Sequence, residues 1–371
     1  TMKQRKLPGV PCSEERTYEI HNRRIARTAA TEGMVLLKNE NDVLPIPKGT
    51  AIALYGAGAV HTIKGGTGSG DVNSRNTVSI LEGLTNAGYR IVTKRWLDEY
   101  EAAYEKARAQ WRDAIWQKEA QMREADDSGF HFFFAYSETP FVFPTGELPG
   151  KEDAETVIYV LSRQAGEGKD RVNGGGDFVL SGQEEQMIEK ICALYPHVVV
   201  VLNTGGIVDL SFADRYANIE GILYMHQPGM EAGNALADLL SGEVVPSGKL
   251  TDSWPCTYTD YPNASVFSHN NGNVEREEYM EGIYVGYRYF DTFAVPVRYC
   301  FGYGLSYTDF AIEVLGIEHF DLGTQDPEIG VKVKVTNTGE RYTGREVVQL
   351  YVSCPQGSLD KEYRRLVGFH K

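Results

Sequence analysis

The sequence predicts an α/β protein, a doubly wound α/β/α sandwich around a mostly parallel sheet of five to six strands. Short apolar runs rich in β-branched residues alternate with helical segments over the first two-thirds of the chain, as in repeated β–α units. From about residue 310 the pattern changes to alternating apolar and polar residues, with turns at 337–339 and 343–344. That second pattern predicts the beginning of a small β-sandwich, with too few strands to close two sheets.

The first elements follow in order. Residues 13–38 have helical features, with Ser13 as cap and Glu14 and Glu15 in the first turn, and they run into a short apolar strand at 34–37. The elements expected next are a strand at 51–55, a helix at 77–87 that ends at Gly88, a strand at 89–93 and a solvated helix at 97–124 anchored by Trp111 and Trp116.

The second half of the sheet starts with a buried strand at 157–161. A capping box, Ser181 with Glu184, begins the next helix, whose apolar face carries Met187, Ile188, Ile191 and Cys192. Further elements are expected as strands at 198–202, 219–225 and 249–254, with a helix at 230–240 before the last of them. Residues rich in Tyr, Asn, Gly and Pro then indicate a surface linker. We expect an α/β domain at 1–257, the linker at 258–308 and a truncated β-domain at 309–371.

Composition limits the classes of partner and compartment. The formal net charge of −14 argues against nucleic acid and anionic membranes, because the overall field repels phosphates. No run of eighteen apolar residues occurs, so no membrane span is expected. The basic start after Met2 has no apolar segment behind it, which predicts a native start without a signal peptide. Five scattered cysteines without a C-x-x-C pair are typical of reduced thiols in a cytoplasmic protein.

The functional interpretation rests on one loop, at 162–171. It leaves the carboxyl end of the strand at 157–161, which is where ligands bind in open α/β sheets. Glycines flank Glu167, and Lys169, Asp170 and Arg171 add charge within its reach. A solvated loop carboxylate is the alternative, and the local pattern leaves it open.

Three other segments invite weaker interpretations. The glycine-rich loop at 65–71 can approach a ligand through its backbone or form a surface turn. Gly56 and Gly58 begin a dinucleotide-binding pattern, but His61 stands where its third glycine belongs. The aromatic stretch at 130–143 can flank a site, bind a partner or form a packed flap. No cofactor or metal is expected from the sequence.

Seven sequence blocks stand together in the order of a known family. They are TEGMVLLKN (31–39), GGTGSG (65–70), RQAGEGKDR (163–171), GMEAG (229–233), PSGKL (246–250), EGIYVGYRY (281–289) and FGYGLSY (301–307). The chain resembles glycoside hydrolase family 3, the β-glucosidase group, over nearly its whole length. Two later blocks, VTNTG (335–339) and GREVVQLY (344–351), are similar to the family's fibronectin type III-like domain.

The resemblance implies a retaining, exo-acting β-glycosidase that removes terminal non-reducing β-linked sugars. In that family a (β/α)8 barrel supplies the nucleophilic aspartate, and the α/β sandwich supplies an acid/base glutamate that matches Glu167. Retaining hydrolysis needs these two carboxyl groups about 5–5.5 Å apart. The resemblance also implies that Ser69 contacts the sugar. It assigns Arg163, Asp170 and Arg171 to substrate binding and to positioning the acid loop, with an ion-pair network within the loop as the alternative.

The sequence departs from the family in one respect. It has no eightfold βα pattern and no counterpart of the family's Ser-Asp-Trp nucleophile motif; the run at 251–254 resembles that motif only superficially. We therefore interpret the chain as the first part of a permuted member, with the barrel in the same gene product as its partner domain. A β-linked glucoside or oligosaccharide is the expected substrate, the chain alone is expected to be inactive, and homo-oligomerisation stays open.

Two functions from other classes remain as alternatives. A non-catalytic carbohydrate-binding or scaffolding module could keep this fold, and an intact barrel downstream would argue against it. A nucleotide-binding oxidoreductase rests only on Gly56 and Gly58.

Overall fold

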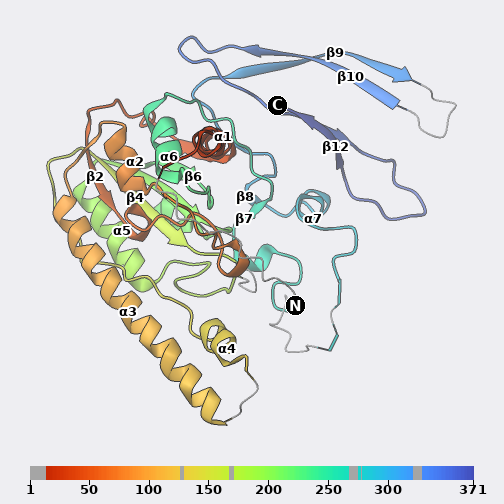
Figure 1. The fold of residues 1–371 in the computed structure, drawn as a ribbon. Helices are drawn as coiled ribbons and strands as arrows, with labels where there is room; N and C mark the ends of the chain where they lie inside the picture. Colours follow the sequence, from red (N-terminus) through yellow and green to blue (C-terminus); the bar gives the residue numbers. More distant parts are fainter. Residues whose placement is uncertain (1–13, 126–128, 167–170, 267–274, 277, 321–327) are drawn as a thin grey trace, which may run out of the picture.

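The computed structural model describes residues 14–125, 129–166, 171–266, 275–276, 278–320 and 328–371. Its centre is a six-stranded sheet in the order β1-β6-β5-β4-β2-β3 (Figure 1). The strands are β1 (Val35–Asn39), β2 (Ala51–Tyr55), β3 (Arg90–Ile91), β4 (Thr156–Arg163), β5 (His197–Thr204) and β6 (Ile219–Tyr224). All neighbouring pairs are parallel except β1 and β6, which run antiparallel. The predicted fold class is confirmed.

The central strands are apolar because both faces of the sheet are covered. Strands β4 and β5 pair in unbroken register over eight residues, from Thr156 opposite His197 to Arg163 opposite Thr204. Residues 198–202 of β5 are fully buried. This register brings the polar ends of the two strands, Arg163 and Thr204, to the same edge of the sheet.

Five helices cover the sheet. Helices α1 (Thr17–Gly33), α2 (Ile80–Asn86) and α6 (Ala232–Ser241) pack together on one face, while α3 (Lys94–Ala125) and α5 (Gly182–Leu194) lie on the other (Figure 1). The Ser181–Glu184 capping box predicted for α5 is present. The predicted cap Ser13 lies outside the described residues, and α1 begins at Thr17. Of the two predicted anchors of α3, Trp116 is instead largely exposed.

The strand predicted at 249–254 is wrong. Only β7 (Trp254–Pro255) forms there, and it pairs with β8 (Val297–Tyr299) in a separate small sheet. The position beside β6 is already filled by β1, so the segment cannot join the main sheet. Leu250 instead exchanges backbone hydrogen bonds with the 302–303 turn, and Leu305 donates its N–H to Leu36 of β1 at 2.8 Å.

The remaining elements are small. Helix α4 (His131–Ser137) follows α3, α7 (Tyr287–Thr292) lies in the predicted linker, and two antiparallel pairs end the chain. These pairs are β9 (Phe310–Phe320) with β10 (Glu328–Asn337), and β11 (Val348–Val352) with β12 (Arg365–His370).

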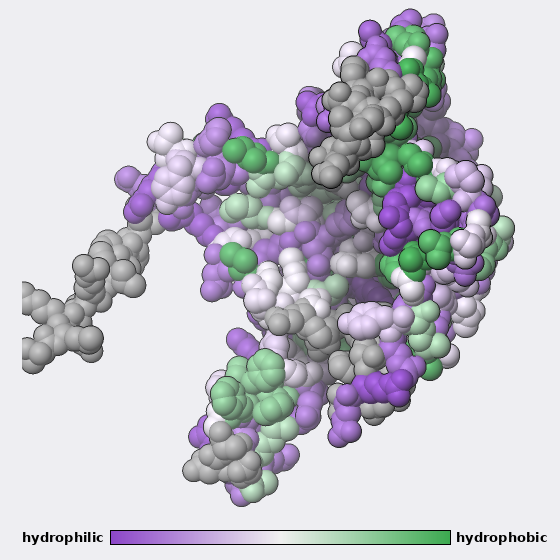
Figure 2. Space-filling model, turned by 90° about the vertical axis from the view of Figure 1, so that its right-hand side faces the viewer, coloured by the Kyte–Doolittle hydropathy of each residue, from purple (hydrophilic) through white to green (hydrophobic). Residues whose placement is uncertain are grey.

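Figure 2 shows apolar areas on the surface at the height of β9 and β10 and, at the opposite end of the molecule, at the height of α4. Within the described residues, no helix is long and apolar enough to cross a bilayer.

Candidate active-site edge

Two glycine-containing loops meet at the carboxyl edge of the sheet. The N–H of Thr67 donates to the carbonyl oxygen of Ala165 at 3.2 Å, and Thr67 forms a parallel bridge with Gly166. A Cβ on Gly166 would lie 2.1 Å from the Thr67 hydroxyl oxygen, so only glycine fits this contact. The side chain of Gln227 donates to the carbonyl oxygens of Gly65 and Ala165 at 3.2 and 3.3 Å, which clamps the two loops together.

This contact relates two of the predicted site residues. Ser69 lies on a short 3₁₀ turn (Gly68–Gly70) of the first loop and is exposed. Glu167 and Asp170 lie outside the described residues, which stop at Gly166 and resume at Arg171. The structure therefore brings the Ser69 loop to the residue immediately before Glu167.

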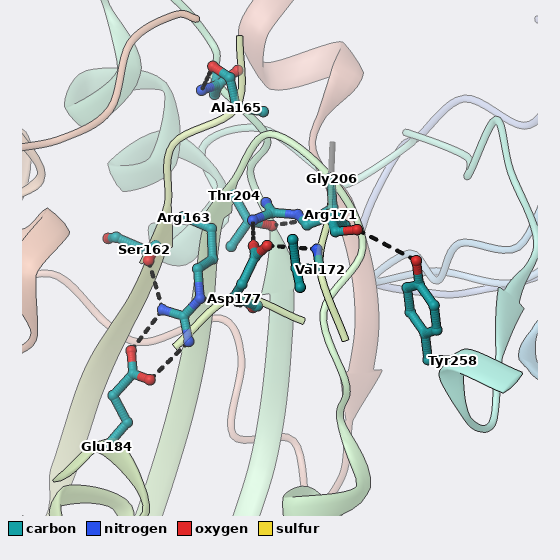
Figure 3. A network of polar contacts seen from close by, with 11 residues as sticks. Ser162, Arg163, Ala165, Arg171, Val172, Asp177, Glu184, Thr204, Gly206 and Tyr258 are labelled. Carbon is teal, nitrogen blue, oxygen red and sulfur yellow. Dashed lines mark hydrogen bonds and ion pairs between the residues drawn. The ribbon is translucent and has the colours of Figure 1, made fainter. Parts of the chain in front are cut away.

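Arg163 lies at the end of β4 and is almost fully buried. Its guanidinium forms a two-pronged ion pair with Glu184 of α5, with N–O distances of 2.6 and 2.7 Å (Figure 3). It also donates to the carbonyl oxygens of Ser162 and Asp177, each at 2.8 Å. Arg163 thereby ties the strand end, the start of α5 and the returning part of the loop.

Arg171 forms a second centre of the same network. Its guanidinium pairs with the carboxylate of Asp177, whose other oxygen accepts the N–H of Val172 at 2.7 Å (Figure 3). The Tyr258 hydroxyl donates to the Arg171 carbonyl oxygen at 3.3 Å. The second terminal nitrogen of Arg171 is buried and has no hydrogen-bond partner among the described residues. This nitrogen is an unsatisfied donor inside the network.

Asn203, to which the sequence interpretation gave no role, organises this edge. Fully buried at the end of β5, it accepts the N–H of Ile63 at 2.7 Å and donates to the carbonyl oxygens of Ile63 and His226 at 2.9 and 2.8 Å. It thus joins the loops that follow β2 and β6. The available signal was an amide directly after the apolar run at 198–202.

His226 occupies an unusual backbone position beside this amide. Its φ of 58° is in the left-handed region, which costs energy for a residue other than glycine. Burial lowers the pKa of its imidazole to about 4, so the ring is neutral at physiological pH. The surrounding hydrogen bonds hold this conformation in place.

Described residues of the loop that follows β4 line three depressions. One of about 530 Å³ contains Gln164 and the aromatic side chains of Trp111, Phe141 and Phe143. A second of about 480 Å³ is lined by Arg171, Asp252, Tyr258 and Phe290 among others, and a third of about 420 Å³ by Arg163, Arg171 and Asp177 among others. Burial raises the pKa of the Asp252 carboxyl. The described residues of the loop therefore border an aromatic depression, a mainly apolar one with Arg171 and Asp252 in its lining, and a charged one.

The aromatic stretch at 130–143 is divided between two environments. Trp111 donates its indole N–H to the carbonyl oxygen of Thr139 at 2.6 Å, and Phe141 packs edge-on against the same ring. In α4, by contrast, Phe133 and Phe134 are more than half exposed. The end of the stretch lines the first depression, while α4 presents aromatic rings to solvent.

Gly56 and Gly58 have a packing role. A Cβ on Gly56 would lie 2.2 Å from the Val160 carbonyl oxygen, and one on Gly58 would lie 2.3 Å from the Ser162 hydroxyl oxygen. Close packing against β4 therefore requires both glycines without any nucleotide.

Comparison with known proteins decides the family. Residues 34–287 match the family model described as Glycosyl hydrolase family 3 C-terminal domain. The chain belongs to glycoside hydrolase family 3. The matched region is the family's C-terminal domain, and the described residues form no (β/α)8 barrel.

Relatives in this family are named as β-glucosidases. Beta-glucosidase A of Butyrivibrio fibrisolvens is 37% identical over 92% of this chain and 43% of its own length. Thermostable beta-glucosidase B of Acetivibrio thermocellus is 33% identical over 94% of this chain and 41% of its own. The chain therefore spans less than half the length of these relatives.

Solved structures agree with this assignment. A β-glucosidase from Paenibacillus barengoltzii superposes with a TM-score of 0.79 at 34% identity, covering 93% of this chain and 36% of that one. The β-glucosidase 3B of Thermotoga neapolitana, solved in complex with α-D-glucose, gives 0.77 at 35% identity, covering 95% and 46%.

Proposed function

We propose that this chain is the acid/base-bearing part of a retaining, exo-acting β-glycosidase of the β-glucosidase type. Glu167 is its acid/base residue, and a (β/α)8 barrel elsewhere in the gene product supplies the nucleophile. The substrate is a terminal, non-reducing β-linked sugar on a glucoside or oligosaccharide. The observation that carries this proposal is the loop after β4, which matches the family motif and leaves the carboxyl edge of a parallel sheet.

The neighbouring contacts support a fixed loop base beside an accessible surface. Arg163 and Asp177 are engaged in bonds to their own domain, so we assign them to positioning rather than to chemistry. Arg171 lines two depressions, which suits a residue that contacts the sugar or the acid. Ser69 is exposed on the adjoining loop, which suits a sugar contact.

The chemistry follows from two carboxyl groups. In the first step the barrel carboxylate attacks the anomeric carbon, the glycosidic C–O bond breaks, and Glu167 gives its proton to the departing oxygen. In the second step Glu167 removes a proton from water, which attacks the anomeric carbon and releases the nucleophile. The anomeric configuration is retained after two inversions.

Removing the acid tests this assignment in the barrel-containing enzyme. Glu167→Ala should abolish most hydrolysis of cellobiose or an alkyl glucoside, since these leaving groups need a proton. An activated aryl glucoside should still form the glycosyl-enzyme, which then accumulates because the second step has lost its base. Azide, which needs no base, should restore turnover and yield a β-glycosyl azide.

The matched controls are the other carboxylates of the loop, Asp170→Ala and Asp177→Ala. Azide rescue in either of these, but not in Glu167→Ala, would move the acid/base role to another residue. Near-normal rates on poor leaving groups in all three variants would remove the loop from the chemistry.

The division of labour between domains has its own test. The 371-residue chain alone should not hydrolyse an aryl β-glucoside, because half of the carboxylate pair is missing. Turnover by the purified chain that disappears in Glu167→Gln would contradict the need for a barrel. A full-length protein that binds cellobiose without any turnover would favour the scaffolding function instead.

A further inference from the structure

A histidine and two glutamates converge outside the proposed active-site loop. His61 follows the 3₁₀ turn Ala57–Ala59, which comes directly after β2. Glu101 and Glu105 are four residues apart on α3, so they share one helix face. One potential ligand atom from each of the three lies within 4.8 Å of the other two. Segments far apart in the sequence thus bring one nitrogen and two carboxylates together.

One pair of side chains in this cluster is in direct contact. His61 Nε2 lies 2.7 Å from a carboxylate oxygen, Oε2, of Glu101. Both atoms are buried, and neither has a hydrogen bond of acceptable geometry to any described residue. At this separation a proton on Nε2, or a cation shared by the two atoms, satisfies both of them.

The imidazole is also held in one orientation. Its ring stacks on Tyr104 with 3.3 Å between the ring centroids and an angle of 16° between the planes. Tyr104 itself is fixed by Arg108, which donates to its hydroxyl oxygen at 3.1 Å. Such outer contacts are the usual means of aiming a histidine at a metal.

The charges that face the imidazole favour a cation. Glu101 and Glu105 contribute negative charge, and Arg108 contributes the opposing positive charge. Burial also holds the pKa of the His61 imidazole below its usual value.

We propose that His61, Glu101 and Glu105 form a binding site for a divalent first-row transition cation. Imidazole with carboxylates is a mixed nitrogen and oxygen set that suits Zn²⁺ or Mn²⁺. With bonds of about 2.1 Å, a nitrogen–oxygen separation of 2.7 Å corresponds to an angle of about 80° at the metal, close to neighbouring positions of an octahedron. Glu105 is exposed, so its carboxylate is free to close the remaining gap.

The surroundings leave room for the rest of the coordination shell. His61, Tyr104 and Arg108 line the aromatic depression of about 530 Å³, which gives solvent and small ligands access. A cation here would join α3 to the loop after β2, next to the segment that carries Thr67. The site therefore lies on the wall of this depression, which Gln164 of the acid loop also lines, and its cation would join two elements without taking part in the proposed hydrolysis.

Mn²⁺ is the probe that tests the site, because thiols bind it weakly and Cys256, Cys300 and Cys354 are exposed. The 371-residue chain is titrated with Mn²⁺, and binding is measured as the loss of the electron paramagnetic resonance signal of free Mn²⁺. The titration should show one saturable site, from which Zn²⁺ displaces the Mn²⁺. His61→Gln, Glu101→Gln and Glu105→Gln should each weaken binding by roughly ten- to a hundredfold or more. The matched control is Glu99→Gln on the same helix, which removes the same charge and should bind as the parent does.

A second measurement separates loss of binding from loss of folding. Mn²⁺ should raise the midpoint of thermal unfolding of the parent chain and of Glu99→Gln, but not that of Glu105→Gln. Because Glu105 is exposed, this variant should fold normally without metal. The proposal is overturned if the parent chain shows no saturable binding of Mn²⁺, or if His61→Gln and Glu105→Gln bind Mn²⁺ as tightly as the parent does. It is also overturned if Glu99→Gln loses as much affinity as those two variants.

Discussion

The N–H of Thr67 donates to the carbonyl oxygen of Ala165 across 3.2 Å, and this contact seats one loop on another at the carboxyl edge of the sheet. The next residue, Gly166, has no room for a side chain against Thr67. Glu167, the proposed acid, is the next residue in the sequence, so the contact fixes the backbone that leads to it. Changes to this contact should act on the loop without removing any charged group.

Gly166→Ala should therefore destabilise the chain by about 1–3 kcal/mol, because its Cβ would collide with Thr67. In the proposed full-length enzyme it should also lower kcat for substrates with poor leaving groups. Urea unfolding and steady-state kinetics measure the two effects. Gly174→Ala is the matched control, since a Cβ there meets nothing within 4 Å. Equal stability of the two variants would contradict the close contact.

The buried pair of Arg163 and Glu184 should behave as a unit. Their side chains are 7% and 14% exposed, so Arg163→Met leaves a largely buried carboxylate without its partner and should cost about 3–5 kcal/mol. Adding Glu184→Gln should recover part of this loss, since the uncompensated charge is gone. A double-mutant cycle by urea unfolding measures the coupling free energy. Additive losses would show that the two side chains do not depend on one another.

His226 should make stability depend on pH in the acid range. Its folded-state pKa of about 4 lies below the 6.5 of an unperturbed imidazole, so between these values the unfolded chain binds more protons. The free energy of unfolding should fall as pH drops from about 6.5 to 4, by roughly 3 kcal/mol from this group. His226→Asn, which tolerates the positive φ, should flatten the profile. The exposed His21→Asn is the control, and an unchanged slope in His226→Asn would contradict the assignment.

Helices α2 and α6 cross at two glycines. A Cβ on Gly83 would lie 2.0 Å from the carbonyl carbon of Gly233. Gly83→Ala should thus lower the free energy of unfolding by about 1–3 kcal/mol, although alanine is the better helix former. Gly182→Ala, at the open start of α5, should be neutral or stabilising by about 0.5–1 kcal/mol. Chemical denaturation compares them, and a stabilising Gly83→Ala would contradict the close crossing.

Local patterns were sufficient to predict most of the main sheet. The buried strands at 157–161 and 198–202 were recognisable because both faces are covered, and Ser181 with Glu184 marked the start of α5. The segment at 249–254 was mistaken for a strand because burial alone does not reveal whether a neighbour offers free hydrogen-bonding groups. Strand β1 had taken that place, and its antiparallel direction depends on contacts far along the chain.

The site was predictable only as separate pieces. The loops at 65–71 and 162–171 were each singled out, but the Thr67–Ala165 bond between them is a tertiary contact that neither pattern contains. Asn203 was missed because a single amide after a strand is also common in turns. The roles of Glu167, Ser69, Asp170 and Arg171 remain predictions, and Glu167 and Asp170 lie outside the described residues.

Leu305 and Tyr303, from the segment after β8, form hydrogen bonds to the edge strand β1. Leu305 binds the Leu36 carbonyl oxygen through its N–H, and the Tyr303 hydroxyl donates to that of Leu37 at 3.1 Å. The end of the sheet is thereby shielded from strand addition by other molecules. A single proteolytic cut between residues 258 and 287 should then leave two fragments that migrate apart under denaturing conditions yet elute together when native. We therefore also expect the molecule to assemble from two separately produced polypeptides.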